Sequence, residues 1–281
     1  KRSAGGTASA RLGLARLLLD AGQPSDAARE GATAERMATA AMLTDQAIEA
    51  LLVQGLAQLR ERSAESITTL LRARAVVRAH PTATAKMKIE AALGEAYAAF
   101  GRSSDALIAY DRAATASQRV TATYESALDR ARNREQKVAL FDGALRLLME
   151  MPESSSRSAQ LFAWSARKKD ALFIGVGTVG APARTHATLS DVRRALDGGT
   201  AVLDYITVDS GIFALVVTAR ASRVVKLSLS VLVTSDLVQR LRRPLVAVDA
   251  GQLDLARAPF DLGLAQRLYA GLFAPLENML G

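Results

Sequence analysis

The side chains that most often carry out catalysis or bind metals are scarce in this sequence. Its 281 residues include no cysteine and two histidines, His80 and His186. The lack of cysteine excludes a disulfide, a cysteine-ligated zinc ion and a thiol nucleophile within these residues. Two histidines alone do not make a histidine-rich metal site. We therefore predict no catalytic residue and no metal site in these residues, and we expect no metal or small-molecule cofactor.

A glycine-rich stretch, GVGTVG at residues 175–180, is the nearest approach to a phosphate-binding motif. A phosphate-binding loop of that kind needs a lysine followed by serine or threonine, and a strand before the glycines. This sequence has neither. Residues 174–187 lack hydrophobic periodicity and are rich in glycine and alanine, which predicts a linker. His186 lies in that linker, where a surface position is favoured over a catalytic one.

The chain is basic, with a formal net charge of +8 and a sequence pI near 10.1. Its arginines are spread along helical segments, and aromatic residues make up 5% of the sequence. A nucleic-acid interface needs basic residues clustered on one face with aromatic or amide side chains nearby, so this function is not favoured. No apolar run reaches the roughly 20 residues that a membrane-spanning helix needs. We therefore expect no membrane partner.

The N-terminal part, up to about Phe173, shows apolar and small residues at spacings of three and four, which is typical of amphipathic helices. The polar turns between these helices recur at a fixed distance. Those at Gly22, Arg62 and Gly101 lie 40 and 39 residues apart. A period of this length indicates a stack of helix pairs in which each pair packs against its neighbours.

The third unit, ALGEAYAAFGRSSDALIAYDRAA at residues 92–114, resembles the tetratricopeptide repeat. The matching residues are Leu93, Gly94, Tyr97, Ala106, Tyr110 and Ala113. We expect Gly94 and Ala106 to let two antiparallel helices approach closely, and the two tyrosines to fill the gap to the neighbouring pair. Gly55 takes the place of Gly94 in the second unit. Because the period exceeds the usual length of about 34 residues, a HEAT-like or other α-solenoid stays open as an alternative.

Tetratricopeptide arrays bind peptides or partner domains along a concave face formed by the first helix of each pair. The resemblance therefore implies that four charged residues project towards such a face: Arg16, Arg60, Lys88 and Glu95. Their side chains suit ion pairs and hydrogen bonds with a protein or peptide partner. A purely solvated role for the same four residues is the alternative.

Between Leu196 and Leu229 the hydrophobic rhythm changes from helical to strand-like. Three runs rich in β-branched and aromatic residues predict a three-stranded meander at residues 201–208, 213–218 and 224–229. The middle run, FALVVT, is apolar almost throughout, so it suits the centre of a sheet that is covered by helices on both faces. Such helices are predicted at residues 190–196, 232–243 and 262–273, with Pro244 ending the second.

This C-terminal part resembles the opening portion of the CHAT domain, a caspase-like domain that accompanies tetratricopeptide repeats. The resemblance is carried by Leu189 and Leu196 before a glycine turn, by the runs at 201–205 and 213–218, and by Leu268-Tyr269 followed by Leu272 and Pro275-Leu276. It implies a sheet flanked by helices, with a catalytic histidine and cysteine that would follow Gly281. We expect the chain to be a piece of a longer protein, because it also begins at Lys1 without a methionine.

The predicted fold class is α+β multidomain. It comprises an N-terminal α-solenoid of tetratricopeptide-like helix pairs at residues 1–173, a linker at 174–187, and the opening part of a caspase-like α/β domain at 188–281. The predicted function is recognition of a protein partner or substrate by the repeats, joined to a caspase-like cysteine peptidase in the full-length protein. The remaining C-terminal part of the CHAT domain is a second expected partner.

Two alternatives of other classes stay open. One is a non-catalytic tetratricopeptide scaffold with a degenerate CHAT domain. The other is a basic α-solenoid that binds nucleic acid, which would bind more weakly as the salt concentration rises.

Overall fold

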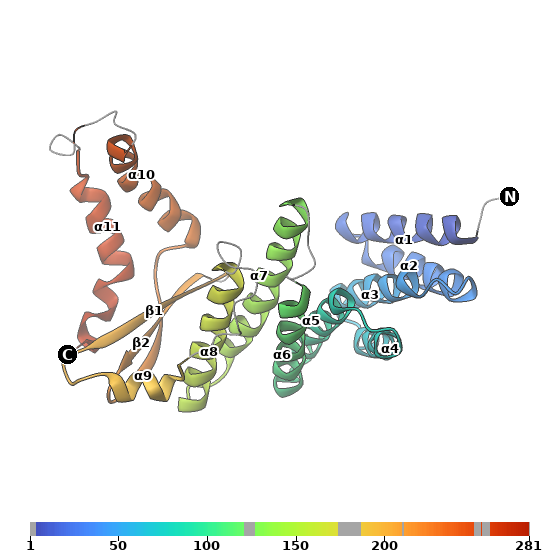
Figure 1. The fold of residues 1–281 in the computed structure, drawn as a ribbon, viewed down its shortest axis with the longest axis horizontal. Coiled ribbons are helices and arrows are strands. Elements are labelled where there is room, and N and C mark those ends of the chain that lie inside the picture. The colour runs from blue at the N-terminus through green and yellow to red at the C-terminus, as the bar shows by residue number, and fades with distance from the viewer. Residues whose placement is uncertain are drawn as a thin grey trace. The chain divides into compact units, whose positions relative to one another are not determined.

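The computed structural model describes residues 4–120, 127–173, 187–209, 211–249, 254 and 259–280. These residues are mostly helical and include one small antiparallel sheet (Figure 1), in agreement with the coarse prediction of helices and a mixed α and β part. The chain divides into two compact units, Lys1–Leu147 with Lys168–Gly180, and Leu148–Arg167 with Ala181–Gly281. Almost all of the predicted linker, including His186, lies outside the described residues. The predicted domain boundaries remain predictions.

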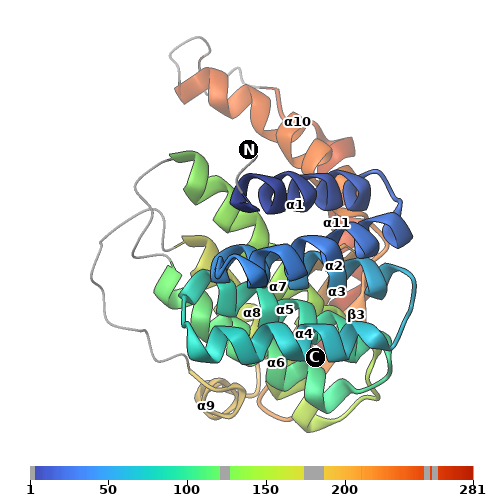
Figure 2. The same ribbon diagram turned by 90° about the vertical axis from the view of Figure 1, so that its right-hand side faces the viewer.

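The first unit begins with six helices of similar length. They are α1 (Ala4–Asp20), α2 (Pro24–Ala40), α3 (Thr44–Arg60), α4 (Glu65–Ala79), α5 (Ala83–Ala99) and α6 (Ser103–Val120). Each of these helices packs against the next one along the chain, as Figure 2 shows, and α1 also contacts α3 while α3 contacts α5. Contacts between helices that are neighbours or next neighbours therefore hold this part of the chain together.

Four of the five turns between these helices share one backbone geometry, and the turn between α4 and α5 is the exception. In these four turns the second residue after the helix takes a positive φ, with values of 73° at Gly22, 56° at Met42, 55° at Arg62 and 72° at Gly101. The amide after Gly22 donates back to the carbonyl of Leu18, and the other three turns repeat this hydrogen bond. This is the Schellman arrangement, which supplies partners to carbonyls at the end of a helix. The sequence predicted a turn at three of these positions and missed the one at Met42.

Glycine at position 42 is expected to stabilise the protein. A side chain at positive φ strains the backbone, and Met42 gains no packing in return because it is 89% exposed. Glycine relieves this strain, but it also gives the unfolded chain more conformational entropy, which offsets part of the gain. We predict that Met42→Gly raises the free energy of unfolding by about 0.5–1 kcal/mol in net. Urea unfolding measures this. Ala41→Gly is the matched control, since Ala41 has a φ of −90° and should lose stability instead; a Met42→Gly protein less stable than the wild type would contradict the prediction.

Small residues let bulky side chains pass between the helices. A Cβ atom added to Gly55 would lie 2.6 Å from Cγ of Leu70, and one added to Gly94 would lie 2.7 Å from the ring of Tyr110. The hydroxyl of the same tyrosine reaches helix α7 (Ala127–Glu150), where it lies 2.6 Å from the position of a Cβ on Gly143. The ring of Tyr110 is therefore held between two glycines on two different helices.

Helix α7 is followed by α8 (Ser155–Phe173). Within the first unit, Nζ of Lys168 on α8 donates to Oδ1 of Asp142 on α7 at 2.6 Å. Both side chains are about nine-tenths buried. In the second unit, the guanidinium of Arg157 donates to the carbonyls of Leu148 and Met149, which satisfies acceptors at the C-terminal end of α7.

The second unit contains the sheet. Its further elements are α9 (Leu189–Ala195), β1 (Ala201–Val208), β2 (Gly211–Thr218), β3 (Ser222–Lys226), α10 (Val231–Asp249), α11 (Leu262–Leu272) and the 3-10 helix η3 (Ala274–Met279). The strands form an antiparallel meander in the order β1-β2-β3. Thr188 caps α9 by accepting from the amide of Asp191, whose carboxylate accepts from the amide of Thr188 in return.

Both faces of the central strand are buried. Ile212, Ala214 and Val216 belong to a cluster with Leu227 and Leu276. The alternate residues of β2 on the other face, Phe213, Leu215 and Val217, are buried as well. The apolar run FALVVT thus lies at the centre of the sheet and is covered on both sides, as the sequence predicted.

Three sequence predictions in this unit were wrong in their boundaries. Strand β2 begins at Gly211, two residues earlier than predicted. Strand β3 begins at Ser222 and ends at Lys226, two or three residues earlier than predicted, because the β2 register pairs Val217 with Ser222 directly after a tight turn. Helix α10 continues through Pro244 to Asp249 instead of ending before the proline. The φ angle of proline is compatible with a helix. Pro244 therefore removes one N–H donor and strains the preceding turn, but it does not end the helix.

Candidate functional site

Charged side chains from alternate helices gather on one part of the first unit. Arg16 lies on α1, Glu49 and Arg60 lie on α3, and Lys88 and Glu95 lie on α5. We call these five residues the charged band. Four of them were predicted from the sequence as peptide-binding residues, whereas Glu49 was not. Because α1 contacts α3 and α3 contacts α5, the band crosses three helices that are 39 or 40 residues apart in the chain.

Glu49 is the centre of the charged band. Its carboxylate accepts from Nη2 of Arg16 at 2.7 Å and from Nζ of Lys88 at 2.9 Å. Partial burial raises the pKa of Glu49, but the hydrogen bonds and charges of Lys88 and Arg16 outweigh it, and the pKa lies below its ordinary value. One carboxylate thus links α1, α3 and α5. The sequence feature that could have predicted the role of Glu49 is its 39-residue distance from Lys88. This distance places opposite charges at equivalent positions of successive repeats.

Arg60 has a structural contact within the charged band. Its Nη1 donates to the carbonyl oxygen of Leu19, near the C-terminal end of α1. A cation at this end of a helix is favourable, because the last carbonyls lack partners within the helix. Arg60 therefore ties α3 to the end of α1, and its charge also acts on Glu95.

Glu95 is exposed to solvent, yet its pKa is shifted by the protein around it. Its side chain is exposed, yet the surrounding protein raises its pKa by desolvation, and the charges of Arg146 on α7 and of Arg60 offset only part of this rise. No hydrogen bond or ion pair joins Glu95 to the other residues that the structure describes. Within the described residues, Glu95 is thus the acid of the charged band whose carboxylate is exposed and is not engaged in an ion pair, whereas Glu49 is paired with Arg16 and Lys88.

The predicted repeat residues lie beneath this surface. Gly55, Leu93, Gly94, Tyr97, Ala106, Tyr110 and Ala113 are all buried. The guanidinium of Arg102 lies 4.5 Å from the ring centre of Tyr97. Burial and the nearby Glu95 raise the pKa of Tyr110, so that its hydroxyl stays protonated. These residues therefore belong to the packed interior of the helical stack.

The charged band offers guanidinium, ammonium and carboxylate groups, and its five residues include no histidine, serine or threonine. His80 is exposed at the end of α4, away from any described cluster of acids. Within the described ranges, no group of histidine, aspartate and glutamate residues could hold a metal ion. The groups of the band suit ion pairs with a peptide or protein.

No protein-family model, curated protein or solved structure matches the chain. In the part of the chain that the structure describes, no helix has both the length and the apolar character that crossing a bilayer requires.

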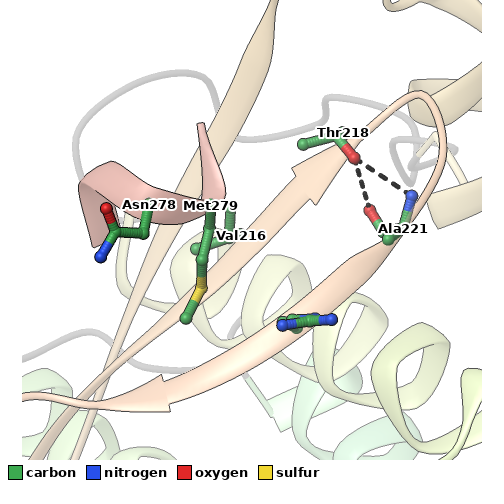
Figure 3. A pocket seen from close by; sticks show the side chains of 6 residues that line it. Val216, Thr218, Ala221, Asn278 and Met279 are labelled. Carbon is green, nitrogen blue, oxygen red and sulfur yellow. Dashed lines mark hydrogen bonds between the residues drawn. The ribbon is translucent and has the colours of Figure 1, made fainter. Parts of the chain in front are cut away.

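The second unit has a small open pocket beside the β2–β3 turn, shown in Figure 3. Its volume is about 230 Å³, and it is lined by Val216, Thr218, Ala221, Arg223, Asn278 and Met279. Thr218 and Ala221 are hydrogen-bonded to each other and close the turn. Arg223 is the sole charged residue of this lining.

Proposed function

We propose that the helical part of this protein is a tetratricopeptide-like array that recognises a protein or peptide along the charged band. The observation that supports this proposal best is the chain of contacts from Arg16 through Glu49 to Lys88, which aligns charged groups of three alternate helices. A regular row of this kind suits an extended ligand, because such a ligand meets one helix after another.

Glu95 is the residue of the charged band whose environment a ligand would change most. A basic group of the ligand beside its carboxylate would add a charge-assisted hydrogen bond in a partly desolvated place, where such bonds are strong. The carboxylate must be ionised for this. Because the folded-state pKa of Glu95 is raised above 4.5, binding should weaken as the pH falls through that raised value, and it should be intact at neutral pH.

A displayed library of unstructured peptides, selected on the whole chain, tests this proposal. We expect the enriched peptides, once synthesised, to bind Glu95→Gln at least about tenfold more weakly than the wild type, which corresponds to about 1.4 kcal/mol. Asp45→Asn is the matched control, since Asp45 is an exposed acid on α3 outside the charged band. Enrichment of no peptide, or equal binding to Glu95→Gln and the wild type, would refute a peptide-binding role for this surface.

We also propose that the second unit is the opening portion of a CHAT domain, and that the full-length protein is a caspase-like cysteine peptidase. The succession of α9, the β1–β3 meander, α10 and α11, with β2 covered on both faces, supports this proposal. The repeats would then recruit the protein that the peptidase cuts. Reading the frame beyond Gly281 tests it: a histidine and later a cysteine, each after an apolar strand-like run, are expected. Their absence would leave a non-catalytic scaffold.

A further inference from the structure

A buried carboxylate on α5 stands where α3 has an apolar side chain. Glu90 is 4% exposed, and the equivalent residue of α3, 39 residues earlier, is the buried Leu51. Burial raises the pKa of Glu90, and nearby positive charges offset only part of this rise. A charge at such a position destabilises the fold unless its partners compensate for the lost water.

Arg74 on α4 departs from the repeat pattern in the same region. The equivalent residues are Ala34, 40 residues earlier, and Ala113, 39 residues later, and both are buried. Nη1 of Arg74 lies 4.0 Å from Oε2 of Glu90, and no described residue donates a hydrogen bond to that oxygen. Replacing a buried ion pair by apolar residues is often neutral or stabilising. Packing alone therefore does not account for these two charges.

Three more cations lie around the carboxylate of Glu90. Arg78 follows Arg74 by four residues on α4, so the two share one face of that helix. Lys86 precedes Glu90 by four residues on α5 in the same way. Arg112 lies on α6, which packs along α5. The charges of all four basic residues act on Glu90; we call Arg74, Arg78, Lys86 and Arg112 the basic patch.

The basic patch carries more charge than Glu90 neutralises. Its four positive charges and the one negative charge leave a net charge of +3. Arg78, Lys86 and Arg112 are exposed, and none of them forms an ion pair with an acid among the described residues. Lys86 lies nine residues before Glu95, which is about half a turn away around α5. The basic patch is therefore separate from the charged band.

We propose that the basic patch binds a phosphate group, either as a free ion or on a phosphorylated side chain of a partner. Cations that act on one carboxylate lie close together, so they suit a compact anion with two negative charges. Guanidinium groups match the oxygens of such an anion in geometry as well as in charge. The patch contains no aromatic side chain on which nucleic-acid bases could stack, so a phosphate group is favoured over single-stranded nucleic acid.

Titration calorimetry of the whole chain tests this proposal with two probes. One is inorganic pyrophosphate, and the other is a blocked peptide that carries one phosphoserine among glycines. We expect saturable binding of at least one probe, with a Kd below about 1 mM. Lys86→Gln and Arg112→Gln should each weaken it at least about fivefold, because each removes a charge-assisted contact. Arg36→Gln is the matched control and should leave binding unchanged, since Arg36 is exposed on α2 outside the patch.

Glu90→Gln changes the charge in the opposite direction. It removes the negative charge beneath the patch and should tighten binding at least about twofold. Tighter binding of pyrophosphate identifies a free ion as the ligand, tighter binding of the phosphopeptide identifies a phosphorylated partner, and either result supports a phosphate site.

Three results would overturn the proposal: binding of neither probe, weaker binding to Glu90→Gln than to the wild type, or equal effects of Arg36→Gln and Arg112→Gln. Retention of duplex DNA without binding of either probe would assign the basic patch to nucleic acid and would overturn it too.

Discussion

Alanine at position 94 is expected to lower the free energy of unfolding by about 2–3 kcal/mol. The new Cβ would lie 2.7 Å from Cδ1 and Cε1 of Tyr110, closer than carbon atoms approach without repulsion. The ring cannot retreat along its own axis, because its hydroxyl lies against Gly143 on α7. Overpacking of a buried site typically costs about 1–3 kcal/mol, and here it outweighs the better helix propensity of alanine.

Gly13→Ala is the matched control for this prediction, because no described atom lies within 4 Å of the new methyl group. It should raise the free energy of unfolding by about 0.5–1 kcal/mol. Urea unfolding of both variants separates the effect of packing from that of propensity. The effect of Gly94→Ala should also shrink when Tyr110→Ala is present, since the two residues are in contact. Wild-type stability of Gly94→Ala would show that Tyr110 moves freely.

Removal of the Asp142 carboxylate should have a still larger effect. Asp142→Ala takes from the buried ammonium of Lys168 an acceptor at 2.6 Å. Breaking a buried ion pair on one side typically costs about 3–5 kcal/mol, because the remaining charge stays out of water. We expect a loss of this size in urea unfolding, or failure of α7 and α8 to pack.

A double variant distinguishes the ion pair from a general loss of packing. Asp142→Leu with Lys168→Met removes both charges and keeps apolar volume, so it should be markedly more stable than Asp142→Ala. Glu35→Ala is the control for an ion pair near solvent, because its partner Arg72 is half exposed, and such pairs are worth about 1 kcal/mol or less. A double variant no better than Asp142→Ala would contradict a dominant role of the buried charge.

Local features of the fold could be predicted from the sequence. Gly22 and Gly101 predicted turns correctly, because glycine takes a positive φ at little energetic cost. The apolar run of β2 announced a covered central strand. The turn at Met42 could not be predicted from its residue type, since methionine is uncommon at positive φ. It follows instead from the spacing of the helices, which begin 20 residues apart at Ala4, Pro24 and Thr44. Pro244 led to the wrong prediction that helix α10 ends before it. The other interactions of a helix can outweigh the loss of the one N–H donor that proline lacks.

The candidate site could be predicted only in part. The types of Arg16, Lys88 and Glu95 suggested binding, but a sequence does not show which charges pair with one another. Glu49 bridges partners that are 33 and 39 residues away, and such distances become contacts only once the helices are stacked. The contribution of Arg146 to the environment of Glu95 likewise depends on where α7 lies beside α5.

The neighbour-to-neighbour contacts of α1 to α6 have a consequence for synthesis of the protein. Each helix finds its main packing partners within about 40 residues of chain, so the first unit has a low contact order there, and such chains fold quickly. Helix pairs can therefore form on the ribosome one after another, since domains and repeats fold as they emerge. The pairs from α1 to α6 can be complete before β1 has been translated, so the apolar strands emerge beside a part of the chain that is already folded.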